Sequence, residues 1–231
     1  MHASSSGSVV TIEPRIRRPN NPVVYCHGAG GTSLDLAVLA QPEQPPRRLV
    51  SYGYSVIATT LAIEDWWGTR EGVAATRRMI GVHRATLGGT GPVVLYGGSM
   101  GAATALQTAL VDPSDAACIV LVIPCLVIEH QRQVSPTLRA YINESWDMTP
   151  IETNLRPLPR GANPIDRAKE LSGVPILMFC ATDDDISYGY QAFAASHGAT
   201  TVVSLGARGH TVDALRQVDP DRVGEFVRMH T

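Results

Sequence analysis

The stretch that decides the fold is PVVLYGGSMGAATAL, residues 92–106. Its apolar first part is typical of a buried strand, its alanine-rich end is typical of a helix, and a serine stands among glycines at the junction. In so sharp a turn, side chains two positions before and after Ser99 would collide with the neighbouring backbone, so glycine is needed at Gly97 and Gly101. We therefore predict a nucleophile elbow that raises the Ser99 hydroxyl into solvent.

Apolar, β-branched runs alternate with helix-like stretches along the chain. The predicted strands are Val9–Ile12, Val23–Cys26, Ser55–Thr60, Val93–Tyr96, Cys118–Ile123, Val174–Ala181 and Thr201–Leu205. The predicted helices are Leu34–Ala40, the segment before Tyr52, Arg70–Leu87, Ala102–Val111, Ala168–Leu171, Tyr188–His197, Val212–Arg216 and Val223–Met229. Most of the apolar runs are continuous, which indicates strands covered on both faces. This order predicts an α/β fold with a mostly parallel, doubly wound sheet and ligands at the carboxyl ends of its strands.

The bulk composition fits one domain. A chain of 231 residues has the length of a single α/β domain, residues 1–231. The formal charge of −2 provides no basic field that would attract nucleic acid. The longest apolar stretch is too short for membrane insertion, and the first residues lack the pattern of a secretory signal, so we expect a cytoplasmic protein.

One segment interrupts the alternation of strands and helices. Residues 129–173 contain five prolines and only a modest helical pattern near Leu138–Ile142. Proline has no backbone N–H and interrupts both helices and sheets, so this segment does not continue the repeating units. We predict a short cap or lid inserted into the single domain, and we expect it to contribute to the choice of substrate.

A serine hydroxyl is a poor nucleophile near neutral pH unless a base accepts its proton. His210 ends the loop sequence LGARGH, residues 205–210, which begins at the end of the last predicted strand. Asp183, Asp184 and Asp185 follow the preceding strand, where a carboxylate would hold the imidazole in the useful tautomer. These aspartates are less suited to a cation, because oxygen ligands in metal loops are usually spaced apart. We predict no metal site.

Glycines also follow the predicted strand that ends at Cys26, in the sequence HGAGG, residues 27–31. Acyl transfer places negative charge on a carbonyl oxygen, and one preorganised N–H group that meets it contributes about 3 kcal/mol. Glycine allows the main chain to approach that oxygen closely. We predict the N–H groups of Ala29 and Met100 as an oxyanion hole, with Gly30 as the alternative to Ala29.

In this order, the HG loop, the G-x-S-x-G elbow, the later acid and the C-terminal histidine resemble the pattern of the α/β-hydrolase superfamily. The resemblance is to a serine esterase or lipase with a short cap, and it covers the chain from about residue 23 onward. It implies Ser99 as the nucleophile, His210 as the base, and Ala29 with Met100 as the oxyanion donors.

The resemblance also implies which aspartate is the acid of the triad and how the sheet begins. The family places its acid three positions after a small residue at the strand end, which from Ala181 selects Asp184, with Asp183 and Asp185 as alternatives. Family members commonly begin with an antiparallel hairpin before the strand that leads to the HG loop. Only about twenty residues precede Val23, so we expect room for one strand and a shortened N-terminal edge.

The expected function is that of a serine hydrolase without a cofactor. It would cleave a carboxylic ester, or a related acyl bond, of a small molecule through an acyl-enzyme on Ser99, with His210 and Asp184 completing a catalytic triad. Peptidase, thioesterase and acyltransferase activities use the same machinery on the same scaffold, so they stay open as alternatives. The rival class is a noncatalytic binding or structural protein that retains the fold.

Overall fold

Eight strands form one sheet in the order β1-β2-β4-β3-β5-β6-β7-β8. The computed structural model describes residues 2–6, 9–13, 21–29, 45–59, 67–148 and 156–231. The strands are β1 (His2–Ser6), β2 (Val9–Glu13), β3 (Val23–Cys26), β4 (Val56–Thr59), β5 (Val93–Gly98), β6 (Ala116–Val122), β7 (Ile176–Cys180) and β8 (Thr200–Ser204). Strands β3 to β8 are all parallel to one another, whereas β2 is antiparallel to both β1 and β4. The predicted, mostly parallel sheet is confirmed.

Most of the helices lie where the sequence predicts them, but α5 (Ile128–Val134) was not predicted and the predicted helix at residues 168–171 is part of a 3-10 turn. They are α2 (Pro45–Ser51), α3 (Arg70–Leu87), α4 (Met100–Val111), α5 (Ile128–Val134), α6 (Pro136–Ser145), α7 (Tyr190–His197), α8 (Val212–Arg216) and α9 (Pro220–His230), with 3-10 turns η1 (Pro113–Asp115) and η2 (Pro164–Leu171). Helix α3 has the predicted bounds because Thr69 caps its first turn and Gly88, at φ 75°, ends it. The predicted helix at residues 34–40 lies outside the described residues.

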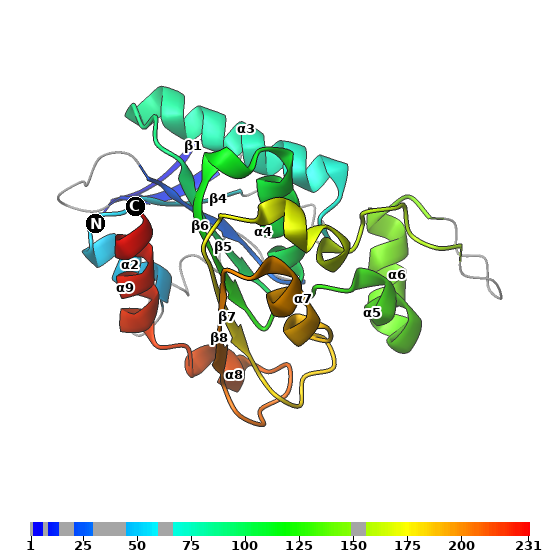
Figure 1. Cartoon of the computed structure of the whole chain (residues 1–231). Coiled ribbons are helices and arrows are strands. Elements are labelled where there is room, and N and C mark those ends of the chain that lie inside the picture. The colour runs from blue at the N-terminus through cyan, green and yellow to red at the C-terminus, as the bar shows by residue number, and fades with distance from the viewer. Residues whose placement is uncertain (1, 7–8, 14–20, 30–44, 60–66, 149–155) are drawn as a thin grey trace.

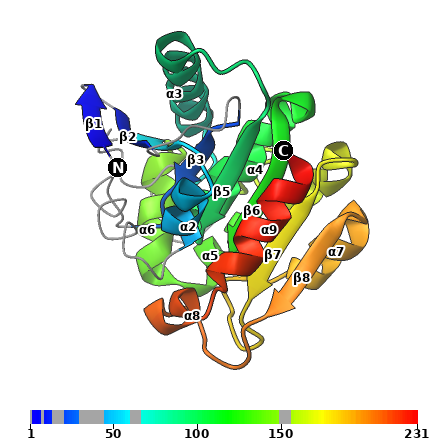
Figure 2. The ribbon, with the colours of Figure 1, turned by 90° about the vertical axis from the view of Figure 1, so that its left-hand side faces the viewer.

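Helices cover the sheet on both of its faces. One apolar core lies between the sheet and α2, α8 and α9, where Leu49 and Phe226 are buried. The second core lies between the sheet and α3, α4, η2 and α7, where Leu106 and Phe193 are buried. In Figure 2, α2 and α9 cross the face of the sheet that is turned toward the viewer. Continuous burial along β3 and β7 explains why their sequences are apolar throughout.

The expected shortening of the N-terminal edge is wrong. Strands β1 and β2 form an antiparallel pair with His2 opposite Glu13 and Ser6 opposite Val9, and β2 continues the sheet against β4. The two strands are five residues each and only two residues of sequence separate them, so the hairpin fits before Val23. The sequence HASSS of β1 has no apolar pattern, because an edge strand needs one hydrogen-bonded neighbour rather than a buried face.

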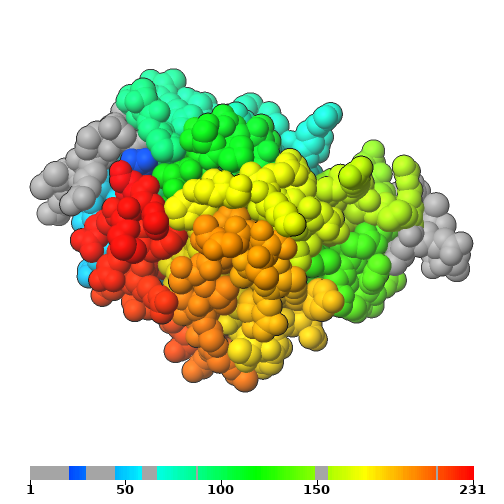
Figure 3. Space-filling view, viewed as in Figure 1, coloured from blue at the N-terminus to red at the C-terminus, as the bar shows by residue number. Residues whose placement is uncertain are grey.

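The segment at residues 129–173 lies between β6 and β7 and carries α5, α6 and η2. Helix α6 contains the predicted helical pattern, whereas α5 was not predicted. Both helices lie at one end of the molecule in Figure 1, and their residues form the same end of the surface in Figure 3. Within the described residues, no helix is both long and apolar enough to cross a bilayer.

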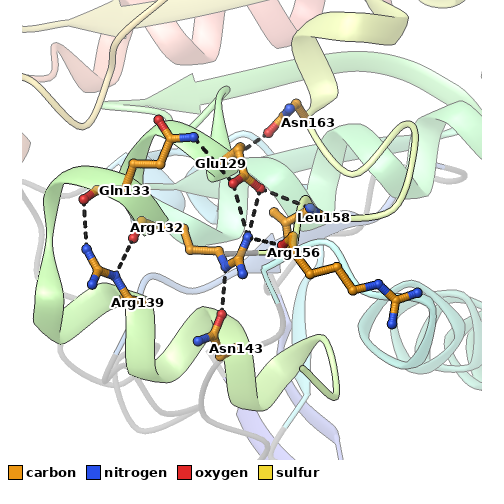
Figure 4. Close-up of polar contacts among 8 residues, drawn as sticks. All are labelled: Glu129, Arg132, Gln133, Arg139, Asn143, Arg156, Leu158 and Asn163. Atoms are coloured by element: carbon orange, nitrogen blue, oxygen red, sulfur yellow. Dashed lines mark hydrogen bonds and ion pairs between the residues drawn. The ribbon is translucent and has the colours of Figure 1, made fainter. Parts of the chain in front are cut away.

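A buried arginine joins the parts of this segment (Figure 4). The Arg132 side chain is 2% exposed. Its guanidinium donates to Asn143 Oδ1 at 2.7 Å, to Glu129 Oε1 at 3.0 Å and to the carbonyl of Arg156 at 2.6 Å. The Glu129 carboxylate also accepts the Leu158 N–H at 3.0 Å. A buried charge is tolerated when it is paired in this way, so these bonds hold α5, α6 and residues 156–158 together.

Candidate active site

Ser99 stands at the turn between β5 and α4. Its backbone has φ 52° and ψ −121°, a conformation that residues with a side chain rarely adopt. The Ser99 N–H donates to the Val122 carbonyl at 3.0 Å, and the Ser99 carbonyl accepts the Cys125 N–H at 3.0 Å. Strained backbone persists only where the surroundings fix it. The end of β6 and the residues that follow it supply that restraint.

The two glycines of the elbow are required by close packing, as predicted. A Cβ atom on Gly97 would lie 2.7 Å from the Ala102 Cα. A Cβ atom on Gly101 would lie only 2.1 Å from the Cys26 carbonyl oxygen at the end of β3. Real Cβ atoms essentially never approach another atom to less than 3.0 Å. Glycine at both positions therefore lets α4 begin directly against β3 and β5.

Ser99, His210 and Asp184 form one chain of hydrogen bonds, although they come from three loops. The Ser99 hydroxyl lies 2.7 Å from His210 Nε2. His210 Nδ1 lies 2.8 Å from Asp184 Oδ2. A carboxylate can only accept, so Nδ1 carries the proton and Nε2 is free to accept the hydroxyl proton. The loops after β5, β7 and β8 meet because the carboxyl ends of parallel strands lie at one edge of the sheet.

The Asp184 carboxylate is enclosed and fully bonded. Its side chain is 0% exposed, whereas that of His210 is 21% exposed. Besides His210, it accepts the Ile186 N–H at 2.8 Å and the Ser187 hydroxyl at 2.7 Å. Burial raises the pKa of the Asp184 carboxyl, but the bonds from His210, Ser187 and Ile186 outweigh that effect and hold the pKa below its ordinary value. Asp184 is therefore ionised at neutral pH and orients the imidazole.

The neighbouring aspartates have other partners. Asp183 Oδ1 accepts the N–H groups of Arg208 and Gly209, each at 2.7 Å. The Asp185 side chain is exposed, and its backbone carbonyl accepts from Gln131 Nε2 at 2.8 Å. Of the three aspartates, the structure brings only Asp184 into contact with the His210 ring.

One predicted oxyanion donor, Ala29, lies on the loop after β3, and the other, Met100, directly follows the serine. Met100 is the first residue of α4, so its N–H has no partner within the helix. Gly28 packs against the serine, since a Cβ there would lie 3.4 Å from Ser99 Cβ, and Ala29 follows it at the edge of the same cavity. The alternative donor, Gly30, lies outside the described residues.

A cavity of about 300 Å³ opens beside Ser99 and His210. Its wall includes Tyr25, Trp67 and Tyr96, and the described residues that line it include no aspartate, glutamate, lysine or arginine. Leu138 of α6 also lines it, so the 129–173 segment contributes to the wall. An engineered apolar cavity of about 150 Å³ in another protein admits benzene. The cavity beside Ser99 thus has room for a small or medium uncharged group.

The sequence did not indicate several residues that shape this site. Ser187 is fully buried and bonds Asp184, but serines in loops are too common to stand out. Tyr25 and Tyr96 were assigned only to buried strands, yet both line the cavity, with ring centroids 5.8 Å apart. Among the described residues, no group of three or more His, Cys, Asp or Glu side chains is arranged to hold a metal ion.

A comparison with protein-family models finds no match, and neither does a comparison with curated protein sequences. Solved structures do match. The chain is similar to an S-formylglutathione hydrolase from Agrobacterium tumefaciens, with 13% identity, a TM-score of 0.70, and 100% of this chain and 94% of the other covered. It is similar to the fluorophosphonate-binding serine hydrolase FphF of Staphylococcus aureus, with 11% identity, a TM-score of 0.71, and coverage of 98% and 96%.

An acylaminoacyl peptidase from Pyrococcus horikoshii matches with 14% identity and a TM-score of 0.69. The match covers 96% of this chain but only 39% of the peptidase, so this chain corresponds to one part of that protein. At such low identities, the shared arrangement of strands and helices is what the comparisons establish. The chain has the fold of the α/β-hydrolase superfamily.

Proposed function

We propose that this chain is a serine hydrolase that cleaves carboxylic esters of small molecules. The observation that carries the proposal is the continuous hydrogen-bond chain from Ser99 Oγ through His210 to the buried Asp184 carboxylate. A histidine and a serine without a shared role are not expected to form a continuous series of hydrogen bonds that ends at a buried carboxylate. The strained backbone of Ser99 adds to the argument, because the fold maintains it at a cost in stability.

The reaction follows from these contacts. His210 Nε2 accepts the proton of the Ser99 hydroxyl while Oγ bonds to the carbonyl carbon of the ester. The N–H groups of Ala29 and Met100 would donate to the oxygen that becomes negative. The imidazolium, stabilised by Asp184, then gives its proton to the leaving alcohol. Water, activated in turn by His210, attacks the acyl-enzyme, releases the acid and restores the serine.

The cavity supports an uncharged acyl group as the part of the substrate that is bound beside Ser99. A charged group would be desolvated against aromatic and aliphatic side chains with no countercharge among the described lining residues. We assign residues 129–173 as a cap within the single domain, because Leu138 of this segment forms part of the cavity wall. Substitution of Leu138 is therefore expected to change the preferred acyl length.

Labelling with a fluorophosphonate probe tests the proposal. The wild-type chain should form a covalent adduct on Ser99, located by mass spectrometry, and Ser99→Ala should form none. Wild type should also hydrolyse uncharged p-nitrophenyl esters faster than a matched thioester or peptide amide. An adduct that survives Ser99→Ala, or no adduct on folded wild type, contradicts a serine mechanism. Preference for the amide or thioester would retain the mechanism and change the substrate class.

A further inference from the structure

Asp183 connects the loop of the acid to the loop of the base. It precedes Asp184 and is exposed, yet its Oδ1 accepts two successive backbone N–H groups, those of Arg208 and Gly209, each at 2.7 Å. These amides belong to the two residues directly before His210. The N–H of Gly209 in particular lowers the pKa of the Asp183 carboxyl, so the acceptor is charged at neutral pH.

The loop that carries His210 needs an external restraint. Gly206 and Gly209 have φ of 71° and 58°, in the left-handed region that glycine enters freely, so the sequence itself does not determine the path of this loop. The first half of the loop is held where the Gly206 carbonyl accepts the Thr182 N–H at 3.0 Å. The second half, next to the catalytic ring, is held by Asp183.

We propose that Asp183 is a positioning residue for the hydrolase reaction, a statement that rests on the function proposed above. Its carboxylate fixes the backbone at residues 208–209, and this places the His210 ring within hydrogen-bond distance of both Asp184 and Ser99. The adjacent aspartates thus have complementary roles, since Asp184 orients the imidazole and Asp183 positions the main chain that carries it.

Substitutions at Asp183 separate geometry from charge. Asp183→Asn keeps an acceptor oxygen at the same reach and loses the charge. Asp183→Glu keeps the charge and moves it by one methylene. Asp183→Ala removes both, and Asp185→Ala is the matched control, because Asp185 is an exposed carboxylate on the other side of Asp184 whose side chain is outside the site. For each chain, kcat and KM on one p-nitrophenyl ester, the rate of fluorophosphonate labelling and the thermal midpoint are measured.

Asp183→Ala should lower kcat and the labelling rate by about 10- to 100-fold with little change in KM, since a displacement near 1 Å at a catalytic group has effects of that size. Asp183→Asn should recover most of this loss, Asp183→Glu should recover less, and Asp185→Ala should match wild type. If Asp183→Ala has the kcat and KM of wild type, the inference is wrong. It is also wrong if Asp183→Glu is fully active while Asp183→Asn loses activity. If Asp183→Ala does not fold, the comparison of kcat between Asp183→Asn and Asp183→Glu tests the inference, which requires the higher kcat in Asp183→Asn. Unlabelled wild type would instead refute the proposed function.

Discussion

Gly101→Ala tests whether the close approach of α4 to β3 positions Ser99, the proposed nucleophile. The added Cβ would lie 2.1 Å from the Cys26 carbonyl oxygen and 2.4 Å from that of His27. Both are backbone atoms, so no side-chain rotation relieves the contact. To restore the 3.0 Å below which Cβ contacts essentially never occur, α4 and β3 must separate by about 0.9 Å, the difference between the two distances. Ser99 and the Met100 N–H move with the helix.

The expected effect is large for both stability and activity. Overpacking a rigid core costs about 1–3 kcal/mol, and a clash with backbone belongs at the upper end of that range. For a chain of this size, about 3 kcal/mol corresponds to a fall in the thermal midpoint of about 6–12 °C. If Ser99 is displaced by nearly 1 Å, the proposed hydrolysis should slow by about 100-fold.

Gly81→Ala is the matched control, because Gly81 lies in α3 and, among the described residues outside its own helix backbone, no atom is within 4 Å of the added Cβ. Alanine favours a helix by about 1 kcal/mol over glycine, so this variant should melt at the wild-type temperature or slightly above it. Both variants are followed by circular dichroism on heating and by fluorophosphonate labelling well below their midpoints. If Gly101→Ala melted and reacted like Gly81→Ala, the steric account of the elbow would be refuted.

Three further predictions concern the Asp184 carboxylate, the buried Arg132 and the cysteine thiols. Because the folded-state pKa of Asp184 is below its ordinary value of 3.8, its carboxylate stabilises the fold above about pH 4 and loses this contribution as the pH falls through the lower folded-state value. Urea unfolding should therefore show the difference in unfolding free energy between wild type and Asp184→Asn narrowing as the pH falls below about 4. Arg132→Ala leaves the Glu129 carboxylate without its buried partner and should cost about 3–5 kcal/mol of unfolding free energy in urea. An equal loss in Arg216→Ala, at an exposed ion pair, would contradict this reasoning. The four cysteines are buried, and burial raises the pKa of Cys26, Cys118 and Cys180 to about 12, so Ellman's reagent should react with the thiols only after denaturation.

The sequence predicted the parts of the fold that depend on local pattern. Continuous apolar runs identify β3 and β7 because these strands are buried on both faces, and glycine at Gly97 and Gly101 identifies the elbow because the backbone leaves no room for a Cβ. The order of strands and motifs along the chain also predicted that Ser99, His210 and an aspartate lie at the carboxyl ends of the strands. In each case the physical cause acts within a few residues or through the topology of a parallel sheet.

The missed elements depend on partners that are distant in sequence. Strand β1 has a polar sequence and exists through its pairing with β2. Helix α5 contains Gln131 and Arg132, two polar side chains that are buried because partners from other segments satisfy them. Hydrophobic periodicity cannot indicate such a helix, since two of its three buried residues are polar.

The loop after β7 links both the loop that carries the proposed base, His210, and helix α5 to the sheet. Asp183 on one side holds the backbone before His210, while the Asp185 carbonyl on the other side accepts from Gln131 of α5. Asp184 between them bonds the imidazole, so the acid cannot shift without moving both neighbours. The end of β7 can hold Asp184 in place because all five residues of this strand are buried, which makes it more rigid than a loop. Substitutions in α5 are therefore expected to affect catalysis through the loop of the acid, even where they contact no substrate.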